Sequence, residues 1–158
     1  MRAAPETCDV CVIGLGPAGS SAAIAAARAG VRVIAIDRRR EAGLPVQCAE
    51  FVPMMLGVDS GPVSSALIQP IAAMETFVES AHDRHSADFR GRMIDRARFD
   101  RALVGQAEAA GVEVRLGCEV RALGADGVVR LADGSAILPR VLIGGDGPRS
   151  RVGAAIGC

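Results

Sequence analysis

The feature that most constrains this chain is the stretch from Cys8 to Asp37, in which two apolar runs flank a glycine-rich turn. The first run, Val10–Ile13, leads directly into GLGPAG at residues 14–19. A segment of small, helix-compatible residues follows, and a second run, Val31–Ile36, ends at Asp37. Strand, GxGxxG, helix, strand and an acid about 20 residues on form the full context of a dinucleotide-binding βαβ unit.

Each residue of the motif has a physical reason to be there. Gly14 allows a tight turn, Gly16 lets backbone N–H groups approach a pyrophosphate, and Gly19 lets the helix pack close to the strand. Pro17 fits the first helical turn, where its missing N–H costs no intrahelical bond. The helix N-terminus favours phosphate, and Asp37 is placed to accept hydrogen bonds from ribose hydroxyls. The alternative interpretation is an ordinary structural turn in another α/β protein.

Composition excludes several other classes of protein. The 158 residues suffice for one domain with a sizeable core, half of them are hydrophobic, and the formal net charge is zero. A neutral chain has no general attraction to nucleic acid or to a charged membrane. Residues 1–7 do not resemble a signal peptide, and the longest apolar stretch, residues 22–36, is interrupted by two arginines and a glycine. We therefore expect a cytoplasmic protein.

Cysteine and histidine do not indicate a metal site. The five cysteines are an odd number, which argues against a closed disulfide framework. Cys8 and Cys11 form a CxxC, but both fall in the first predicted strand, where an offset of three predicts side chains on opposite faces. We interpret them as small core residues. His82 and His85 lie in a polar segment and are typical of solvated loop histidines.

The rest of the chain alternates between helical and strand patterns. It predicts, in order, a turn-rich loop at 38–45, a short helix starting within 47–56, a strand at 71–79, a helix from 96 to 110, a strand at 112–116, a three-stranded meander at 119–138, a buried strand at 141–145 and a capped helix at 151–156. We therefore predict a doubly wound, Rossmann-like α/β fold with a three-stranded β-meander, forming one domain over residues 1–158.

Four separated motifs together resemble a known family. They are GLGPAGSSAA with Asp37, PVQCAE at 45–50, DRARFDRAL at 95–103 and VLIGGDGPRSRVG at 141–153. In this order they look like the N-terminal FAD-binding part of the flavoproteins related to aromatic hydroxylases. Within that group, PVQCAE most resembles the geranylgeranyl reductases, which reduce isoprenoid chains. The resemblance covers nearly the whole chain.

The resemblance implies a set of cofactor contacts. It places Ala18 and Gly19 at the pyrophosphate, Asp37 at the ribose, Cys48 and Ala49 beside the flavin, Arg96 on the phosphate side, the Val120 backbone near the adenine, and Asp146-Gly147 as a DG element linked to the flavin and the nicotinamide cofactor. The full set of candidate cofactor-binding residues is Gly14, Gly16, Pro17, Ala18, Gly19, Asp37, Arg38, Cys48, Ala49, Arg96, Val120 and Asp146. No catalytic residue is assigned.

Four of these candidates also have purely structural interpretations. Arg38 either binds a phosphate or ribose or belongs to a solvated loop end, together with the two arginines that follow it. Arg96 suits phosphate recognition, but a surface ion pair is its alternative. Asp146 follows a buried strand where α/β ligands bind, or it caps the following turn. Cys48 is as well explained as a loop filler as by any chemistry.

The chain also departs from the family pattern. Asp37 stands where the family usually has Glu, and Ala49 and Phe51 stand where geranylgeranyl reductases commonly have Gly. A second flavin motif, a GD element, and the lipid-binding region are expected after the DG element. We therefore expect the chain to be a fragment, or a truncated product that needs another chain.

These observations favour an FAD-dependent oxidoreductase that reduces isoprenoid double bonds, with NAD(P)H as a candidate electron donor. An aromatic hydroxylase or halogenase is the alternative enzyme, and a non-catalytic nucleotide-binding fragment is the alternative outside enzymes. The expected partners are a small-molecule or lipid isoprenoid substrate and no nucleic acid. Peripheral membrane contact of the full-length protein and a homo-oligomer stay open.

Overall fold

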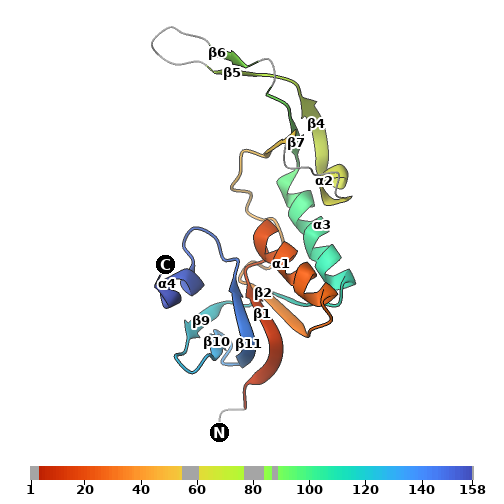
Figure 1. Cartoon of the computed structure of the whole chain (residues 1–158). Helices are drawn as coiled ribbons and strands as arrows, with labels where there is room; N and C mark the ends of the chain where they lie inside the picture. The colour runs from red at the N-terminus through yellow and green to blue at the C-terminus, as the bar shows by residue number, and fades with distance from the viewer. Residues whose placement is uncertain (1–3, 55–60, 77–83, 87–88, 158) are drawn as a thin grey trace.

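The computed structural model describes residues 4–54, 61–76, 84–86 and 89–157 (Figure 1). The helices are α1 (Pro17–Arg28), α2 (Gly61–Ala66), α3 (Arg96–Ala109) and α4 (Arg151–Ile156). The strands are β1 (Glu6–Ile13), β2 (Val33–Asp37), β3 (Phe51–Pro53), β4 (Leu67–Ile71), β5 (Met74–Thr76), β6 (Arg84–Ser86), β7 (Gly91–Ile94), β8 (Glu113–Leu116), β9 (Val120–Leu123), β10 (Val129–Leu131) and β11 (Ala136–Gly144).

A six-stranded sheet in the order β8-β2-β1-β11-β10-β9 forms the centre of the fold. The four strands β8, β2, β1 and β11 are parallel, whereas β9, β10 and β11 form an antiparallel meander. Right-handed crossovers place a helix on the sheet between parallel strands, as α1 is placed between β1 and β2. The predicted Rossmann-like fold with a three-stranded meander is thus confirmed.

The two faces of the sheet have separate hydrophobic cores. On one face, Val12 of β1 and Ala35 of β2 pack with Ile24 of α1 and Leu103 of α3. On the other face, β1 and β2 pack with the meander strands and α4, and the buried residues there are Cys8, Cys11, Ile13, Ile34, Ile36, Val120, Val129, Leu131, Ile137 and Val152. Both faces of the parallel strands are therefore covered, as apolar runs such as Val10–Ile13 require.

The prediction that Cys8 and Cys11 lie on opposite faces is wrong. The backbone N–H groups of Asp9 and Val10 both donate to the Arg32 carbonyl, at 3.1 Å each, which is the pattern of a β-bulge. The extra residue shifts the alternation of side chains by one, so both cysteines enter the same core. Burial raises the pKa of the Cys11 thiol to about 12, consistent with a core role. In the described part of the chain, no group of three or more His, Cys, Asp and Glu residues could hold a metal ion.

Three further expectations differ from the structure. Within 47–56, where a short helix was expected to start, residues 51–53 form the strand β3, which pairs with β7, a strand about 40 residues further along the chain. Met54 follows in a 3₁₀ conformation, and residues 55 and 56 lie outside the described residues. The meander's last strand and the buried strand at 141–145 form one continuous strand, β11. The strand expected at 71–79 is replaced by β4 and β5, and residues 77–79 lie outside the described residues, as does His82.

The strands β4 to β7 extend away from the central sheet as an arm (Figure 1). β3, β7 and β4 form a three-stranded sheet, and β5 pairs with β6. None of the described helices has the length and the apolar character needed to cross a lipid bilayer.

Candidate functional site

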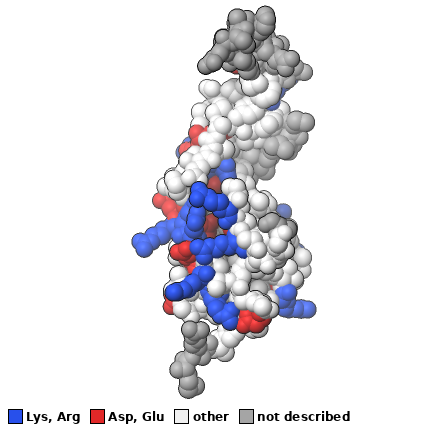
Figure 2. Space-filling view, turned by 90° about the vertical axis from the view of Figure 1, so that its left-hand side faces the viewer, with Lys and Arg blue, Asp and Glu red and all other residues white. Residues whose placement is uncertain are grey.

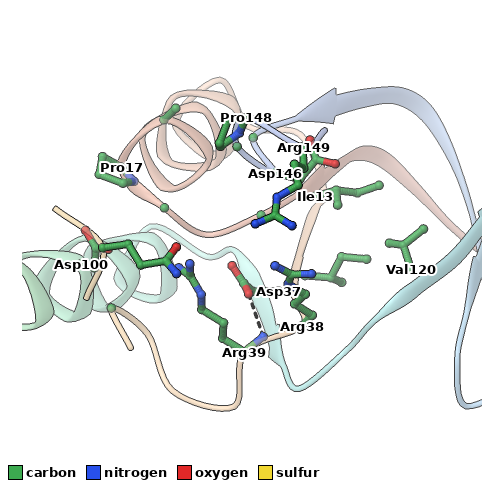
Figure 3. A pocket seen from close by; sticks show the side chains of 18 of the residues that line it. Ile13, Pro17, Asp37, Arg38, Arg39, Asp100, Val120, Asp146, Pro148 and Arg149 are labelled. Atoms are coloured by element: carbon green, nitrogen blue, oxygen red, sulfur yellow. Dashed lines mark hydrogen bonds between the residues drawn. The ribbon is translucent and has the colours of Figure 1, made fainter. Parts of the chain in front are cut away.

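The carboxyl ends of the four parallel strands meet at one edge of the central sheet. Ile13 lies opposite both Ile36 and Gly144, and Asp37 lies opposite Leu116. The loops that follow these strands therefore share one edge, which is where open α/β sheets bind ligands. They line a cavity of about 530 Å³ there (Figure 3).

The glycine loop after β1 is packed backbone against backbone. A Cβ on Gly19 would lie 1.8 Å from the Gly14 carbonyl oxygen, and one on Gly14 would lie 2.4 Å from the Gly145 oxygen. Gly14 also has φ +93°, a conformation that favours glycine. Gly16 differs, because a Cβ there would meet nothing within 4 Å, and this residue lines the cavity.

The N-terminus of α1 faces the cavity with free donors. Its N-cap, Gly16, has no side chain to accept a hydrogen bond, and the first turn contains no acidic residue. Pro17 is the first helical residue, and Ala18 beside it lines the cavity. The unsatisfied N–H groups of a twelve-residue helix and its dipole thus favour an anion at this point.

Asp37 connects the end of β2 to the glycine loop. Its Oδ2 accepts from the Leu15 backbone N–H at 2.8 Å, and its Oδ1 accepts from the Arg39 N–H at 2.8 Å (Figure 3). Each oxygen keeps a second lone pair, so the carboxylate can still accept from a ribose hydroxyl. Asp37 therefore fixes the loop whether or not a nucleotide is bound.

Arg96 is the first residue of α3 and lines the same cavity. The ion pair considered as its structural alternative is present, because Arg96 Nε donates to Asp100 Oδ1 at 2.8 Å. Burial alone would lower the pKa of Arg96, but the hydrogen bond to Asp100 and the charge of that carboxylate raise it. The guanidinium is thus a permanent cation at the cavity wall.

Asp146 performs the capping role considered as its alternative. Its carboxylate accepts from Ser150 Oγ at 2.6 Å and from the Arg151 backbone N–H at 2.7 Å. Burial raises the pKa of Asp146, but these hydrogen bonds outweigh burial and leave the pKa below its usual value. Asp146 lines the cavity as well, so its predicted link to a cofactor stays a prediction.

Val120 also lines the cavity, next to the start of the meander. Its backbone carbonyl accepts from Arg151 Nη1 at 2.6 Å, and Arg151 also pairs with Glu119 at 3.3 Å. These contacts connect β9 with α4 across the cavity wall. The carbonyl of Val120 already has a protein partner, and the predicted adenine contact of this backbone stays a prediction.

The cavity wall is rich in arginine. All 18 basic residues of the sequence are arginines, and Figure 2 shows basic side chains crowded on one face of the molecule. The charged residues of the lining are Arg38, Arg39, Arg96, Arg149, Arg151, Asp37, Asp100, Glu119 and Asp146. All four acids already have protein hydrogen bonds, whereas the side chains of Arg38, Arg39 and Arg149 have no partner among the described residues. The cavity therefore suits an anionic ligand.

The structure brings together nine of the twelve predicted residues in the cavity lining. They are Gly14, Gly16, Pro17, Ala18, Asp37, Arg38, Arg96, Val120 and Asp146. Gly19 lies behind the loop, where it is buried and packs on Gly14. Cys48 and Ala49 are exposed and are not in the lining, although the residues just before them, at 45–47, are. Their place beside a flavin stays a prediction.

Sequence reasoning missed several residues of this site, of which four are instructive. Arg39 and Arg149 lie in loops, and only the meeting of strand ends brings their side chains to one cavity (Figure 3). Asp100 was visible in the motif at 95–103 but was assigned no role. Gly145 packs on Gly19, because a Cβ on Gly145 would lie only 2.8 Å from the Gly19 Cα. The sequence feature that could have indicated it is the pair of glycines directly after an apolar strand.

Comparison with protein families and curated proteins gives consistent results. The FAD binding domain family matches residues 7–158. An uncharacterized protein in the nifH2 5′ region of Methanosarcina barkeri is 34% identical over 94% of this chain and 87% of its own length. Digeranylgeranylglycerophospholipid reductases of Methanopyrus kandleri and Methanosarcina acetivorans are 32% and 35% identical. These matches cover 94% and 92% of this chain but only 42% and 39% of the reductases.

Solved structures share the fold. A geranylgeranyl bacteriochlorophyll reductase-like protein from Thermoplasma acidophilum superposes with a TM-score of 0.75 at 24% identity, covering 91% of this chain and 40% of that one. PqsL of Pseudomonas aeruginosa gives 0.75 at 20% identity, covering 97% and 47%. The myxobacterial halogenase CndH gives 0.71 at 26% identity, covering 93% and 39%.

The different surroundings of Gly16 and Gly19 predict opposite effects of the same substitution. Gly19→Ala forces a methyl group onto a backbone oxygen and should destabilise the protein by about 1–3 kcal/mol. Gly16→Ala meets no protein atom, so the free energy of unfolding should change by less than about 0.5 kcal/mol. Its methyl group should nevertheless obstruct a phosphate and weaken binding of ADP about tenfold or more. Urea unfolding and calorimetric titration measure both quantities, and equal ADP affinity of Gly16→Ala and wild type would contradict the proposed position of the phosphate.

Asp37 should contribute more to adenosine affinity than Arg38. Asp37→Ala removes an acceptor for the ribose and leaves the Leu15 N–H unpaired, a loss of roughly 1–3 kcal/mol. Binding of FAD should weaken by about ten- to a hundred-fold. Arg38→Ala is the matched control, since it changes the neighbouring residue without touching these hydrogen bonds. A dissociation constant unchanged in Asp37→Ala would show that the acid does not serve the nucleotide.

Proposed function

Because the chain belongs to the FAD binding domain family, we propose that it is the FAD-binding part of an oxidoreductase that reduces isoprenoid double bonds. The chain spans about 40% of the length of the curated reductases it matches. In this proposal residues 1–158 form the cofactor domain, and the substrate-binding region corresponds to the remaining part of those relatives.

The observation that carries the proposal is the cavity at the carboxyl ends of the parallel strands. Its glycine loop approaches the cavity with bare backbone at Gly16, and the N-terminus of α1 offers unpaired donors. Asp37 has acceptor capacity for a ribose, and arginines surround the space between them. A nucleoside diphosphate carries a diphosphate that these N–H groups and arginines can bind, and a ribose whose hydroxyls Asp37 can accept from. The residues present therefore fit the adenosine diphosphate half of FAD.

The reaction class is supported by the relatives and by one motif. Several relatives are named digeranylgeranylglycerophospholipid reductase, and PVQCAE at 45–50 resembles the corresponding motif of geranylgeranyl reductases. Bound FAD supplies two-electron hydride chemistry, with NAD(P)H as the proposed donor and an isoprenoid double bond of a lipid as the proposed acceptor. The residues of this chain bind and orient the nucleotide half of that cofactor.

A monooxygenase or halogenase is the second candidate. The halogenase CndH is 26% identical to this chain and shares its fold with a TM-score of 0.71. The cavity at the parallel strand ends serves FAD equally well in either reaction, so its lining does not favour one of them. The motif at 45–50 and the names of the relatives favour the reductase.

The choice of cofactor can be tested directly. Protein refolded with FAD should carry flavin absorbance through gel filtration, whereas NAD should dissociate, because the motifs at 95–103 and 141–153 match flavoproteins rather than dehydrogenases. ADP should compete with FAD, since both share the half of the cofactor that the cavity fits. Tight binding of NAD with no affinity for FAD would exclude the proposal.

Turnover of a geranylgeranyl lipid by the 158 residues alone can also be tested. The 158 residues alone should bind FAD less tightly than a full-length reductase, although tightly enough to keep it through gel filtration. They should reduce no geranylgeranyl lipid, because hydride transfer needs the reacting atoms held about 3–3.5 Å apart. In this proposal the residues of the lining hold only the nucleotide end of the cofactor. The assay uses FAD, dithionite or NAD(P)H, and a geranylgeranyl lipid, with a full-length reductase as the positive control. Turnover equal to that of the control would show that the active site lies within these residues.

A further inference from the structure

Asp100 is unusual because it is a buried acid beside a cofactor cavity. Its side chain is 4% exposed, and it is the only charged residue classed as buried among those that the structure describes. It lies on the face of α3 turned toward the core and also lines the cavity. Burial of an unpaired carboxylate destabilises the folded protein, so the position of Asp100 requires an explanation.

The partner of Asp100 is Arg96, one helical turn earlier. Asp100 Oδ1 accepts from Arg96 Nε at 2.8 Å, and the Arg96 side chain remains 24% exposed toward the cavity. Because the contact uses Nε, the two terminal amino groups of the guanidinium are not held by Asp100. Those are the groups with which arginine binds phosphate oxygens.

Both ends of Arg96 are held in place. Its backbone N–H donates to Glu50 Oε1 at 3.0 Å, and the preceding residue, Asp95, caps the helix by accepting from the Arg98 N–H at 2.9 Å. Asp100 then fixes the far end of the side chain. A long side chain that is already ordered loses less rotamer freedom when a ligand binds.

Helix stability alone does not explain a buried pair. A neighbouring pair at the start of the same helix, Asp95 and Arg98, is exposed and lies at 4.0 Å without burial. Exposed pairs of this kind contribute little to stability, and a buried pair often contributes no more than apolar residues would. The buried carboxylate of Asp100 instead holds the Arg96 guanidinium so that it faces the cavity.

We propose that Asp100 is a positioning residue for the diphosphate of the cofactor and acts through Arg96. The proposal rests on the proposed FAD-binding function and extends it to a residue that contacts no ligand itself. It predicts that substitution of Asp100 weakens the binding of a ligand that carries phosphates, and does so only when Arg96 is present.

A double-mutant cycle tests this proposal on the full 158-residue chain. Wild type, Asp100→Asn, Arg96→Met and the double variant are titrated with ADP and with adenosine by calorimetry. Asp100→Asn should weaken ADP binding about five- to fifty-fold and leave adenosine binding unchanged. In the Arg96→Met background the same substitution should change ADP affinity by less than about twofold.

Thermal unfolding of every variant separates positioning from stability. Asp126→Asn is the matched control, since it breaks an exposed aspartate–arginine pair of the same sequence spacing that lies outside the cavity lining. It should leave ADP affinity unchanged. If Asp100→Asn does not fold, Arg96→Lys breaks the same Nε contact and should weaken ADP binding to a similar extent.

Two results would overturn the proposal while wild type still binds ADP. One is an equal loss of ADP affinity from Asp100→Asn in both backgrounds, which would mean a merely structural role. The other is unchanged ADP affinity of Asp100→Asn in the wild-type background. Wild-type protein that binds neither ADP nor FAD would instead exclude the proposed function itself, and the role of Asp100 with it.

Discussion

The backbone contact among Gly14, Gly19 and Gly145 is the constraint on which the cofactor end of this protein depends. Each of these residues has backbone atoms of another within 3 Å of the position its Cβ would take, so no side chain fits at any of them. The contact holds α1 against β1 and brings the loop after β11 to the same point. Asp146 follows Gly145 directly, and its bonds to Ser150 and Arg151 then set the start of α4. One close packing of main chain therefore fixes two sides of the cavity at once.

The electrostatics of the cavity follow from how its acids are used. Asp37 accepts from the glycine loop, Asp100 pairs with Arg96, Glu119 pairs with Arg151, and Asp146 accepts from the first N–H of α4. Each carboxylate thereby has hydrogen-bond donors within the protein, and Asp37 keeps acceptor capacity for a ribose. The arginines of the neighbouring loops are left to face the opening. The acids thus stabilise the loops around the cavity, and the positive charge of the unpaired arginines favours binding of an anion there.

Local features of this fold could be predicted from the sequence, whereas pairings between distant segments could not. The βαβ unit and the position of Asp37 depend on neighbouring residues and were predicted correctly. β3 exists because β7 pairs with it from far along the chain, so the local pattern at 47–56 did not predict this strand. The faces predicted for Cys8 and Cys11 were wrong because the carbonyl of Arg32, just before β2, accepts from two successive N–H groups of β1 and creates the bulge. Nine of the twelve site residues line the cavity, and the unpredicted Arg39 and Arg149 reach it only through strand convergence.

The loop at 45–50, which carries the resemblance to reductases, is connected to Arg96 through Glu50. The Glu50 carbonyl accepts from the Ile94 N–H at 2.9 Å, and its carboxylate accepts from the N–H of Arg96. Glu50 also has φ +61°, a conformation in which glycine would be less strained. A glycine would relieve that strain but would lose the carboxylate that holds the first turn of α3. The strained backbone is therefore consistent with a side chain kept for its contact, and this contact couples the loop to Arg96, the residue that we propose faces the phosphates.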